Sequence, residues 1–274
     1  MSEVGERAAS AASRLITAGE LSDPTVGYVL ALADDALVAA QRVGEWIAAA
    51  PQLEEDVALA NIGLDLLGQG RSLLGYAGSL MEPPRSEDDL AYWRDERAFR
   101  NVQLVERPWG EGDRDFAVAM ARLLVLATYL HELWTALRTS ADQTLAAVAA
   151  KAVKEVDYHL DHARMWVLRL GDGTDESHRR MQAALAGEWR YVEELFDTTH
   201  IAPALVDAGV AVDPMSFRDA FDRRVTTVLR EATLDVPEVT PAVTGGRRGV
   251  HTPSMGYLLA EMQHLARSHP GATW

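Results

Sequence analysis

Lys154-Glu155-Val156-Asp157-Tyr158-His159 is the stretch on which the interpretation of this sequence turns, because it almost forms a metal-binding motif of helical proteins. Four-helix proteins that hold two irons use Glu-x-x-His, which places both ligands on one face of a helix. Here His159 is present, but the residue three positions before it is Val156, which cannot bind a metal. The nearest carboxylate, Glu155, lies four positions before His159. The stretch therefore indicates a bundle helix with an incomplete ligand motif.

Around this stretch, apolar residues at helical spacing predict four long helices. Asp23-Pro24 supplies an N-cap and a proline at the first helical position, Pro51 ends the first helix, and Gly171-Asp172-Gly173 ends the fourth. Two long helices, a connection over residues 85–112 and two more long helices are the plan of a four-helix bundle with one long crossover. The sequence therefore predicts an all-α fold with additional C-terminal helices. The core helices are expected at about 25–49, 52–78, 114–138 and 142–170, a short helix at 86–94, and the C-terminal helices at 177–197, 214–232 and 254–267.

The composition restricts the function. The chain has 274 residues, a net charge of −15 and no cysteine, so thiolate metal sites and cysteine nucleophiles are excluded. The acidic balance disfavours nucleic acids, whose phosphates require a basic surface. The N-terminus lacks a signal-peptide pattern, and no uncharged apolar run reaches the length of a membrane span. We expect a cytoplasmic protein with a flexible N-terminal extension over residues 1–24 and a single helical domain over 25–274.

Each long helix carries a polar residue among apolar neighbours. These residues are Glu45 on the first helix, Asp65 on the second, Glu132 on the third, and Glu155 with His159 on the fourth. One interpretation is that they are ordinary surface residues or helix-surface ion pairs, because carboxylates are rarely buried. The other is a carboxylate-bridged di-iron centre, which needs a Glu from each of two helices and a Glu-x-x-His from each of the other two.

The ligand set is incomplete for that centre. Asp65 is followed three positions later by Gly68 rather than histidine, and Val156 replaces the carboxylate that would accompany His159. Losing both a histidine and a carboxylate leaves too few donors for two metal ions. We therefore predict a degenerate site, with neither metal nor catalytic residues in this chain.

Carboxylates buried without a metal need a positive partner, because stranding a charge in a dry core costs several kcal/mol. The two lysines of the chain, Lys151 and Lys154, both lie beside Glu155. We hypothesise that an ammonium group, from Lys151 in the first place, replaces the metal. Replacing Lys151 with methionine should then lower the melting temperature by several degrees. The alternative is that both lysines are solvated.

Two further groups of residues are candidates for partner contacts. Trp93, Phe99 and Trp109 lie in the crossover, and aromatic side chains are favoured anchors of interfaces, although core packing is the alternative. Arg247 and Arg248 lie in the loop Gly245-Gly246-Arg247-Arg248-Gly249, which matches no phosphate-loop fingerprint. This loop is either a docking site for a partner or a CoA phosphate, or a plain surface turn.

Several long motifs, in the same order along the chain, resemble the C subunits of bacterial phenylacetyl-CoA epoxidases. The resemblance covers roughly residues 26–274, and family members share the Lys-Glu-x-x-Tyr-His pattern found at 154–159. The motifs are Gln41-Arg42-Val43-Gly44-Glu45-Trp46, residues 59–69, Arg94-Asp95-Glu96-Arg97, residues 151–155, Tyr158-His159-Leu160, residues 171–175, residues 231–237, Gly245-Gly246, residues 260–263 and Pro270-Gly271-Ala272-Thr273-Trp274.

The resemblance implies a ferritin-like fold and a role in aerobic phenylacetate catabolism. In that family a multicomponent monooxygenase epoxidises the ring of phenylacetyl-CoA with oxygen and electrons derived from NADPH. The catalytic A subunit holds the di-iron site, while the C subunit is a non-catalytic structural partner. A small B subunit and a reductase complete the complex, so the cofactor is expected in the A subunit and none in this chain.

Two other functions remain open at this stage. The chain would be an active di-iron or di-manganese oxygenase if Glu45, Asp65, Glu132, Glu155 and His159 bound metal with altered spacing. Alternatively, it would be a free-standing helical binding protein without an oxygenase partner. Metal analysis separates the first possibility from a structural role, and co-purification with a catalytic partner separates the second.

Overall fold

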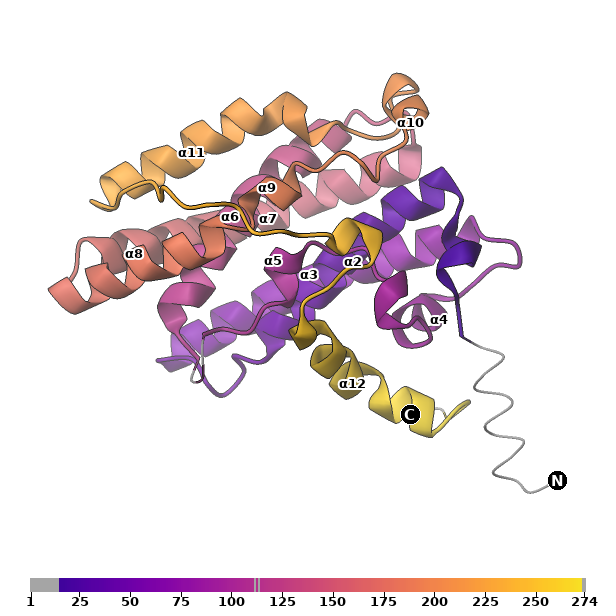
Figure 1. Cartoon of the computed structure of the whole chain (residues 1–274), viewed down its shortest axis with the longest axis horizontal. Coiled ribbons are helices and arrows are strands. Elements are labelled where there is room, and N and C mark those ends of the chain that lie inside the picture. The colour runs from indigo at the N-terminus through magenta and orange to yellow at the C-terminus, as the bar shows by residue number, and fades with distance from the viewer. Residues whose placement is uncertain (1–14, 111, 113, 273–274) are drawn as a thin grey trace.

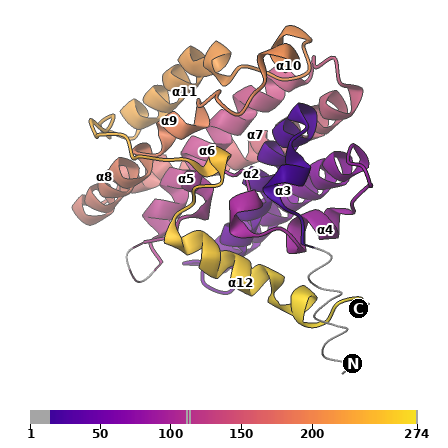
Figure 2. The same cartoon turned by 45° about the vertical axis from the view of Figure 1, so that its right-hand side comes forward.

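The computed structural model describes residues 15–110, 112 and 114–272, and this part of the chain is helical (Figures 1 and 2). It contains no strand; one isolated parallel β-bridge joins Ile16 to Arg94. The predicted all-α, ferritin-like fold is confirmed. The four long helices are α2 (Pro24–Gly44), α3 (Leu53–Ser79), α6 (Phe116–Leu137) and α7 (Gln143–Gly171).

Helix α2 begins where the sequence predicts and ends earlier. The Asp23 carboxylate accepts hydrogen bonds from the backbone N–H groups of Thr25 and Val26, which caps the helix. The helix ends at Gly44 instead of reaching residue 49. The chain turns there and buries the Trp46 ring edge-on against the rings of Trp109 and Phe116, 6.0 and 5.7 Å away between centroids. Burial of this large aromatic surface opposes a straight continuation of the helix.

The central helices of the bundle are α2 and α6, which are apolar on nearly all sides. Helix α2 packs on α3, α6 packs on α7, and α3 and α7 meet each other. By length and composition alone α6 is apolar enough to cross a membrane, but 78% of its most apolar stretch is buried inside the fold. A helix that is apolar all round and covered by others is the core of a bundle.

The crossover and the C-terminal elements cover one side of these helices. The segment after α11 runs across the front of the bundle in Figure 1 before it ends in α12, and α11 packs on α6 and α7. The predicted helix over 177–197 is broken into α8 and α9, because the chain turns at Arg190 and Tyr191. The shorter elements are α4 (Glu87–Tyr92), α5 (Gln103–Glu106), α8 (Asp175–Trp189), α9 (Val192–Leu195), α10 (Pro203–Asp207), α11 (Arg218–Glu231), α12 (Pro253–Ser268) and the 3-10 helices Ala18–Leu21, Glu96–Ala98, Pro214–Phe217 and Gly246–Arg248.

Buried ion pairs hold these outer segments to α2. The Asp34 carboxylate, fully buried, binds the Arg94 guanidinium of the crossover at 2.5 Å and also accepts a hydrogen bond from the backbone N–H of Arg100. The neighbouring Asp35 binds Arg247 at 2.7 Å. Two adjacent carboxylates of one apolar helix therefore fix segments that lie about 60 and 210 residues further along the chain.

The N-terminal segment differs in part from the predicted extension. Residues 1–14 lie outside the described residues. Residues 15–24, expected to belong to a flexible extension, are instead packed on the fold: Ile16 and Leu21 are buried, and the Ile16 N–H donates a 2.9 Å hydrogen bond to the Trp93 carbonyl. These two apolar side chains anchor residues 15–24 to the fold, although the small, polar residues around them predicted a flexible segment.

Candidate functional site between α3 and α7

The candidate ligands of the second and fourth long helices meet on the contact between α3 and α7, which we call the α3–α7 seam. His159 Nε2 lies 3.1 Å from Asp65 Oδ2, and the Gln69 amide donates a 3.0 Å hydrogen bond to Glu155 Oε2. The Lys151 ammonium lies 3.1 Å from the other oxygen of Glu155. The seam thus consists of small groups in which each carboxylate has a partner, while Gln69 Oε1 is buried without a hydrogen bond.

The seam continues toward one end of the bundle with a third group. Glu55, buried near the start of α3, accepts a 2.7 Å hydrogen bond from the Trp166 indole and lies 3.1 Å from His162 Nε2. Burial lowers the pKa values of His159 and His162 below their ordinary range, against the attraction of Asp65 and Glu55. The lowered pKa values favour the neutral form of both rings; His159 forms a hydrogen bond with Asp65, whereas His162 Nε2 is buried without one.

Glu55 and Trp166 were not among the predicted site residues. Glu55 lies in the acidic first turn of α3, where the helix dipole favours any carboxylate, so its presence there does not by itself indicate a buried site. The spacing did contain a signal: Glu55 precedes the apolar positions Ala58 and Leu59 by three and four residues, so it lies on the core side of the helix.

The other two predicted ligands lie elsewhere. Glu45 follows the last residue of α2 and binds Arg42 at 2.5 Å. Glu132 on α6 binds Arg224 of α11 at 2.9 Å and contacts the adjacent His131. The altered-spacing oxygenase would need Glu45 and Glu132 to converge with the seam carboxylates, and their ion pairs hold them in other places instead.

The two positions that interrupt the ligand motifs are filled in ways that do not fit a metal. Val156 is fully buried, so an apolar side chain lies where the motif requires a carboxylate. A Cβ atom on Gly68, at the position of the missing histidine, would lie 4.0 Å from Lys151 Nζ. Within the described residues, no group of three or more histidine and carboxylate side chains is arranged to hold a metal ion. The donor set therefore does not fit a di-iron cluster.

Lys151 and Lys154 lie on the surface, so neither ammonium group occupies the interior of the bundle. The Lys151 side chain is 72% exposed, although it does pair with Glu155 as the hypothesis of a neutralising cation requires. Lys154 is exposed as well. The hypothesis is corrected in one respect: Lys151 neutralises Glu155 from the solvent side of the seam and does not stand inside it.

The predicted partner contacts are mostly internal. Trp93, Phe99 and Trp109 are buried in the core, which is the alternative that their sequence left open, so they offer no surface to a partner. Arg247 is buried against Asp35 and donates hydrogen bonds to two backbone carbonyls. Of this group only Arg248 is on the surface, where it lies 3.3 Å from Asp197.

The glycines of that loop have a structural explanation. A Cβ atom on Gly246 would lie 2.0 Å from the Asn101 carbonyl oxygen, and Gly249 has a φ of 74° with the Arg97 carbonyl oxygen 2.3 Å from its Cβ position. The loop must therefore approach the crossover backbone closely to bring Arg247 to Asp35. The motif is a buried turn, not a phosphate cradle.

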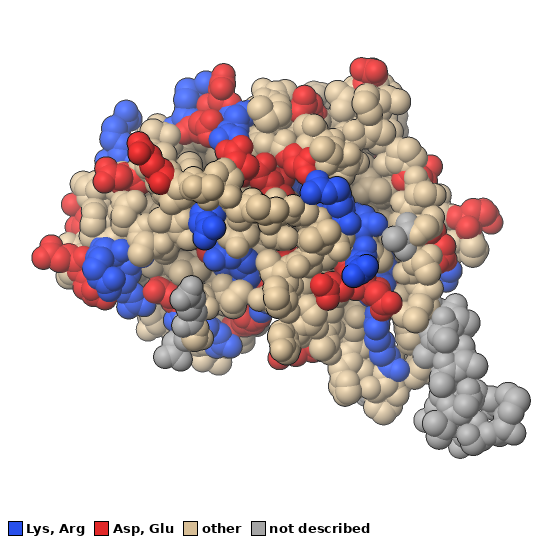
Figure 3. Space-filling model, in the orientation of Figure 1, with Lys and Arg blue, Asp and Glu red and all other residues tan. Residues whose placement is uncertain are grey.

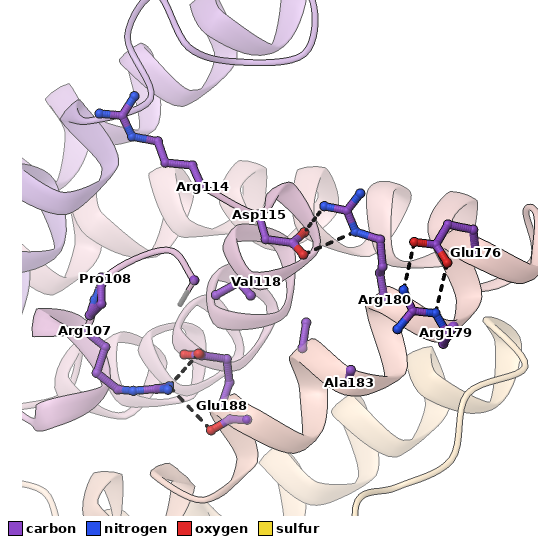
Figure 4. Close-up of a pocket in the computed structure, with 13 residues that line it drawn as sticks. Arg107, Pro108, Arg114, Asp115, Val118, Glu176, Arg179, Arg180, Ala183 and Glu188 are labelled. Carbon is purple, nitrogen blue, oxygen red and sulfur yellow. Dashed lines mark hydrogen bonds and ion pairs between the residues drawn. The ribbon is translucent and has the colours of Figure 1, made fainter. Parts of the chain in front are cut away.

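A separate surface cavity of about 760 Å³ lies between α8 and the segment that enters α6 (Figure 4). Arg179 points to Glu176 and Arg180 to Asp115, and Arg107 binds the buried Glu188. These three arginines are already neutralised by carboxylates, and Arg114 also lines the cavity. The face drawn in Figure 3 likewise shows acidic and basic side chains interspersed, without a broad basic patch.

Comparison with known proteins identifies the family. A family model described as phenylacetic acid catabolic protein matches residues 12–274. The chain belongs to this family. Among its relatives is the C subunit of 1,2-phenylacetyl-CoA epoxidase from Escherichia coli (strain K12), which is 49% identical over 247 residues; the match covers 90% of the chain and 98% of the relative. The resemblance inferred from the sequence motifs is confirmed, and as a member of the phenylacetic acid catabolic family the chain is homologous to one component of an epoxidase.

Proposed function

We propose that this protein is the non-catalytic structural component of a multicomponent phenylacetyl-CoA epoxidase in the cytoplasm. In this proposal it forms a hetero-oligomer with a homologous catalytic A subunit that holds the di-iron site. A small B subunit and an NADPH-dependent reductase complete the complex, which epoxidises the ring with O₂. The similarity to the C subunit of a known epoxidase supports the assignment to the complex.

One observation carries the non-catalytic assignment. The two positions that would complete the metal motifs hold Gly68 and the buried Val156, while the remaining donors Asp65, Glu155 and His159 are used in hydrogen bonds and ion pairs across the α3–α7 seam. The seam carboxylates have partners among the side chains of this chain, including the Lys151 ammonium, so no metal ion is needed to offset their charges. This favours a protein that contributes its surface and its stability to the complex rather than redox chemistry.

Co-expression with the catalytic A subunit tests the proposal. The chain should co-purify with it at equal ratio, and the catalytic partner should be less soluble when expressed alone. Iron analysis should assign the metal to the catalytic partner: the isolated, iron-supplied chain should hold well under one iron per molecule. Stoichiometric iron in the isolated chain, or epoxidation without the A subunit, would refute the non-catalytic role.

A further inference from the structure

The outer side of α3 exposes large apolar residues in a single stripe. Leu53, Val57 and Leu64 are 74%, 54% and 64% exposed, and their spacing of four and seven residues places them on one side of the helix. Ile47, which follows α2, and Leu67 on α3 are also exposed, and both line one groove together with Leu64. We call these five residues the outer apolar face. Single exposed apolar residues are common, but a contiguous group indicates an interaction site.

A groove lies beside this face. The groove has a volume of about 480 Å³ and lies between the end of α2 and α3. Small residues line it, among them Gly44 and Gly63, while Leu64 and Ile47 contribute apolar walls. A Cβ atom on Gly44 would meet nothing within 4 Å, so the space is open. Such a groove accommodates a large apolar side chain from a partner helix.

The charges around the face favour a partner other than a second copy. Glu54 is exposed next to Leu53, Glu45 lines the groove, and the chain as a whole has a net charge of −15. Two copies would bring these acidic rims together, and like charges across an interface are unfavourable. A surface with an apolar centre and lysine or arginine at its rim complements the face better.

We propose that the outer apolar face docks the catalytic partner of the epoxidase, through a helix that inserts an apolar side chain into the groove and places basic residues against the acidic rim. This inference rests on the proposed function, because it assumes that the chain has such a partner. It adds the surface that the partner uses, and it assigns the contact to residues outside both the buried core and the α3–α7 seam.

Three substitutions test the face in the co-expressed complex. Val57→Asp and Leu64→Arg place charges at exposed apolar positions, so the fold should be retained. Gly44→Leu fills the groove at a position where a Cβ atom meets nothing within 4 Å, and it replaces the last residue of α2 with a better helix former, so the stability of the free chain should stay the same or rise. Each should weaken binding to the catalytic partner at least tenfold, and the Val57→Asp/Leu64→Arg double variant should no longer co-purify.

The matched control is Val243→Arg, because Val243 is fully exposed and lies between α11 and α12, away from the face. Circular dichroism and thermal unfolding of every variant should match those of the wild type, apart from a gain for Gly44→Leu. The control should bind like the wild type.

The outcomes separate this inference from the proposed function. Failure of the wild-type chain itself to bind the catalytic partner would refute the proposed function. Wild-type affinity in all three folded variants would refute the docking face and leave the proposed function in place. A wild-type homodimer in size-exclusion chromatography with light scattering, converted to monomer by Leu64→Arg, would show that a second copy is the occupant and would overturn the choice of partner.

Discussion

Replacing Lys151 with methionine tests how much the Lys151 ammonium contributes in place of a metal ion. The Lys151 side chain is 72% exposed and its ion pair with Glu155 spans one helical turn. Exposed pairs of this kind contribute about 0.3–0.5 kcal/mol, and exposed ion pairs in general less than about 1 kcal/mol. Glu155 also retains its hydrogen bond from Gln69. In a domain of this size 1 kcal/mol corresponds to about 2–4 °C, so the melting temperature should fall by less than about 3 °C.

This value is smaller than the several degrees expected for a lysine inside the bundle, since removing one partner of a buried ion pair costs about 3–5 kcal/mol. The measurement is a double-mutant cycle with Lys151→Met, Glu155→Gln and the double variant, using urea unfolding of the purified full chain. The structure predicts a coupling energy below about 1 kcal/mol. Lys154→Met, which removes another exposed lysine of the same helix, is the control.

A coupling energy above about 2 kcal/mol, or a loss of more than about 5 °C for Lys151→Met alone, would contradict this reasoning. Either result would mean that the ammonium group is desolvated in the protein and holds the seam together. It would support the original hypothesis that the Lys151 ammonium lies inside the bundle and replaces a metal ion.

Three other perturbations have defined outcomes. Arg94→Met strands the fully buried Asp34 and should lower the free energy of unfolding by about 3–5 kcal/mol, part of which a second change, Asp34→Asn, should restore; a cost below about 1 kcal/mol in denaturant unfolding would be inconsistent with this. Trp109→Ala should lower the free energy of unfolding by about 3–5 kcal/mol through lost core packing, while the folded variant should bind the catalytic partner with wild-type affinity in a titration. Weaker binding at unchanged stability would instead identify Trp109 as a partner contact. Because burial lowers the pKa of His159, the unfolded chain binds protons there more readily, so this ring lowers stability as the pH falls below about 6.5. The pKa of His251 is raised by Glu106 against the effect of burial, so this residue acts in the opposite direction. The contribution of His159 is therefore isolated by comparing the unfolding free energies of the wild type and His159→Gln at pH 7 and at pH 5.5. The variant should lose less stability between the two pH values than the wild type, and equal losses would exclude a contribution from His159.

Local sequence signals predicted the long helices well. Apolar periodicity, the Asp23 cap and the closing glycines depend on neighbours within one or two turns, and the four core helices lie close to their expected bounds. The end of α2 was placed too late because Trp46 turns inward to meet Trp109, a residue 63 positions away. Tertiary packing of this kind overrides local helix propensity, and no local pattern reports it.

The buried ion pairs were missed for a related reason. Asp34 and Asp35 interrupt a helix that is apolar on all sides, which is itself a signal that both are buried and need partners. Their partners Arg94 and Arg247 are two among many arginines of the chain, and the sequence does not identify which ones reach α2. The motif containing Arg247 was noticed, but its function in binding Asp35 depends on the long-range fold.

The contacts of the α3–α7 seam explain how the fold accommodates incomplete metal motifs. In a bundle built to hold two metal ions, removing the ions leaves several carboxylates close together, and their repulsion destabilises the fold. Here Glu45 and Glu132 are held by arginines outside the seam, and the seam carboxylates each contact a neutral histidine, an indole, an amide or an exposed lysine. The repulsion that a metal would offset is therefore absent from these contacts. In the proposed complex, such a chain would present the same outer surface whether or not the catalytic partner has received its iron.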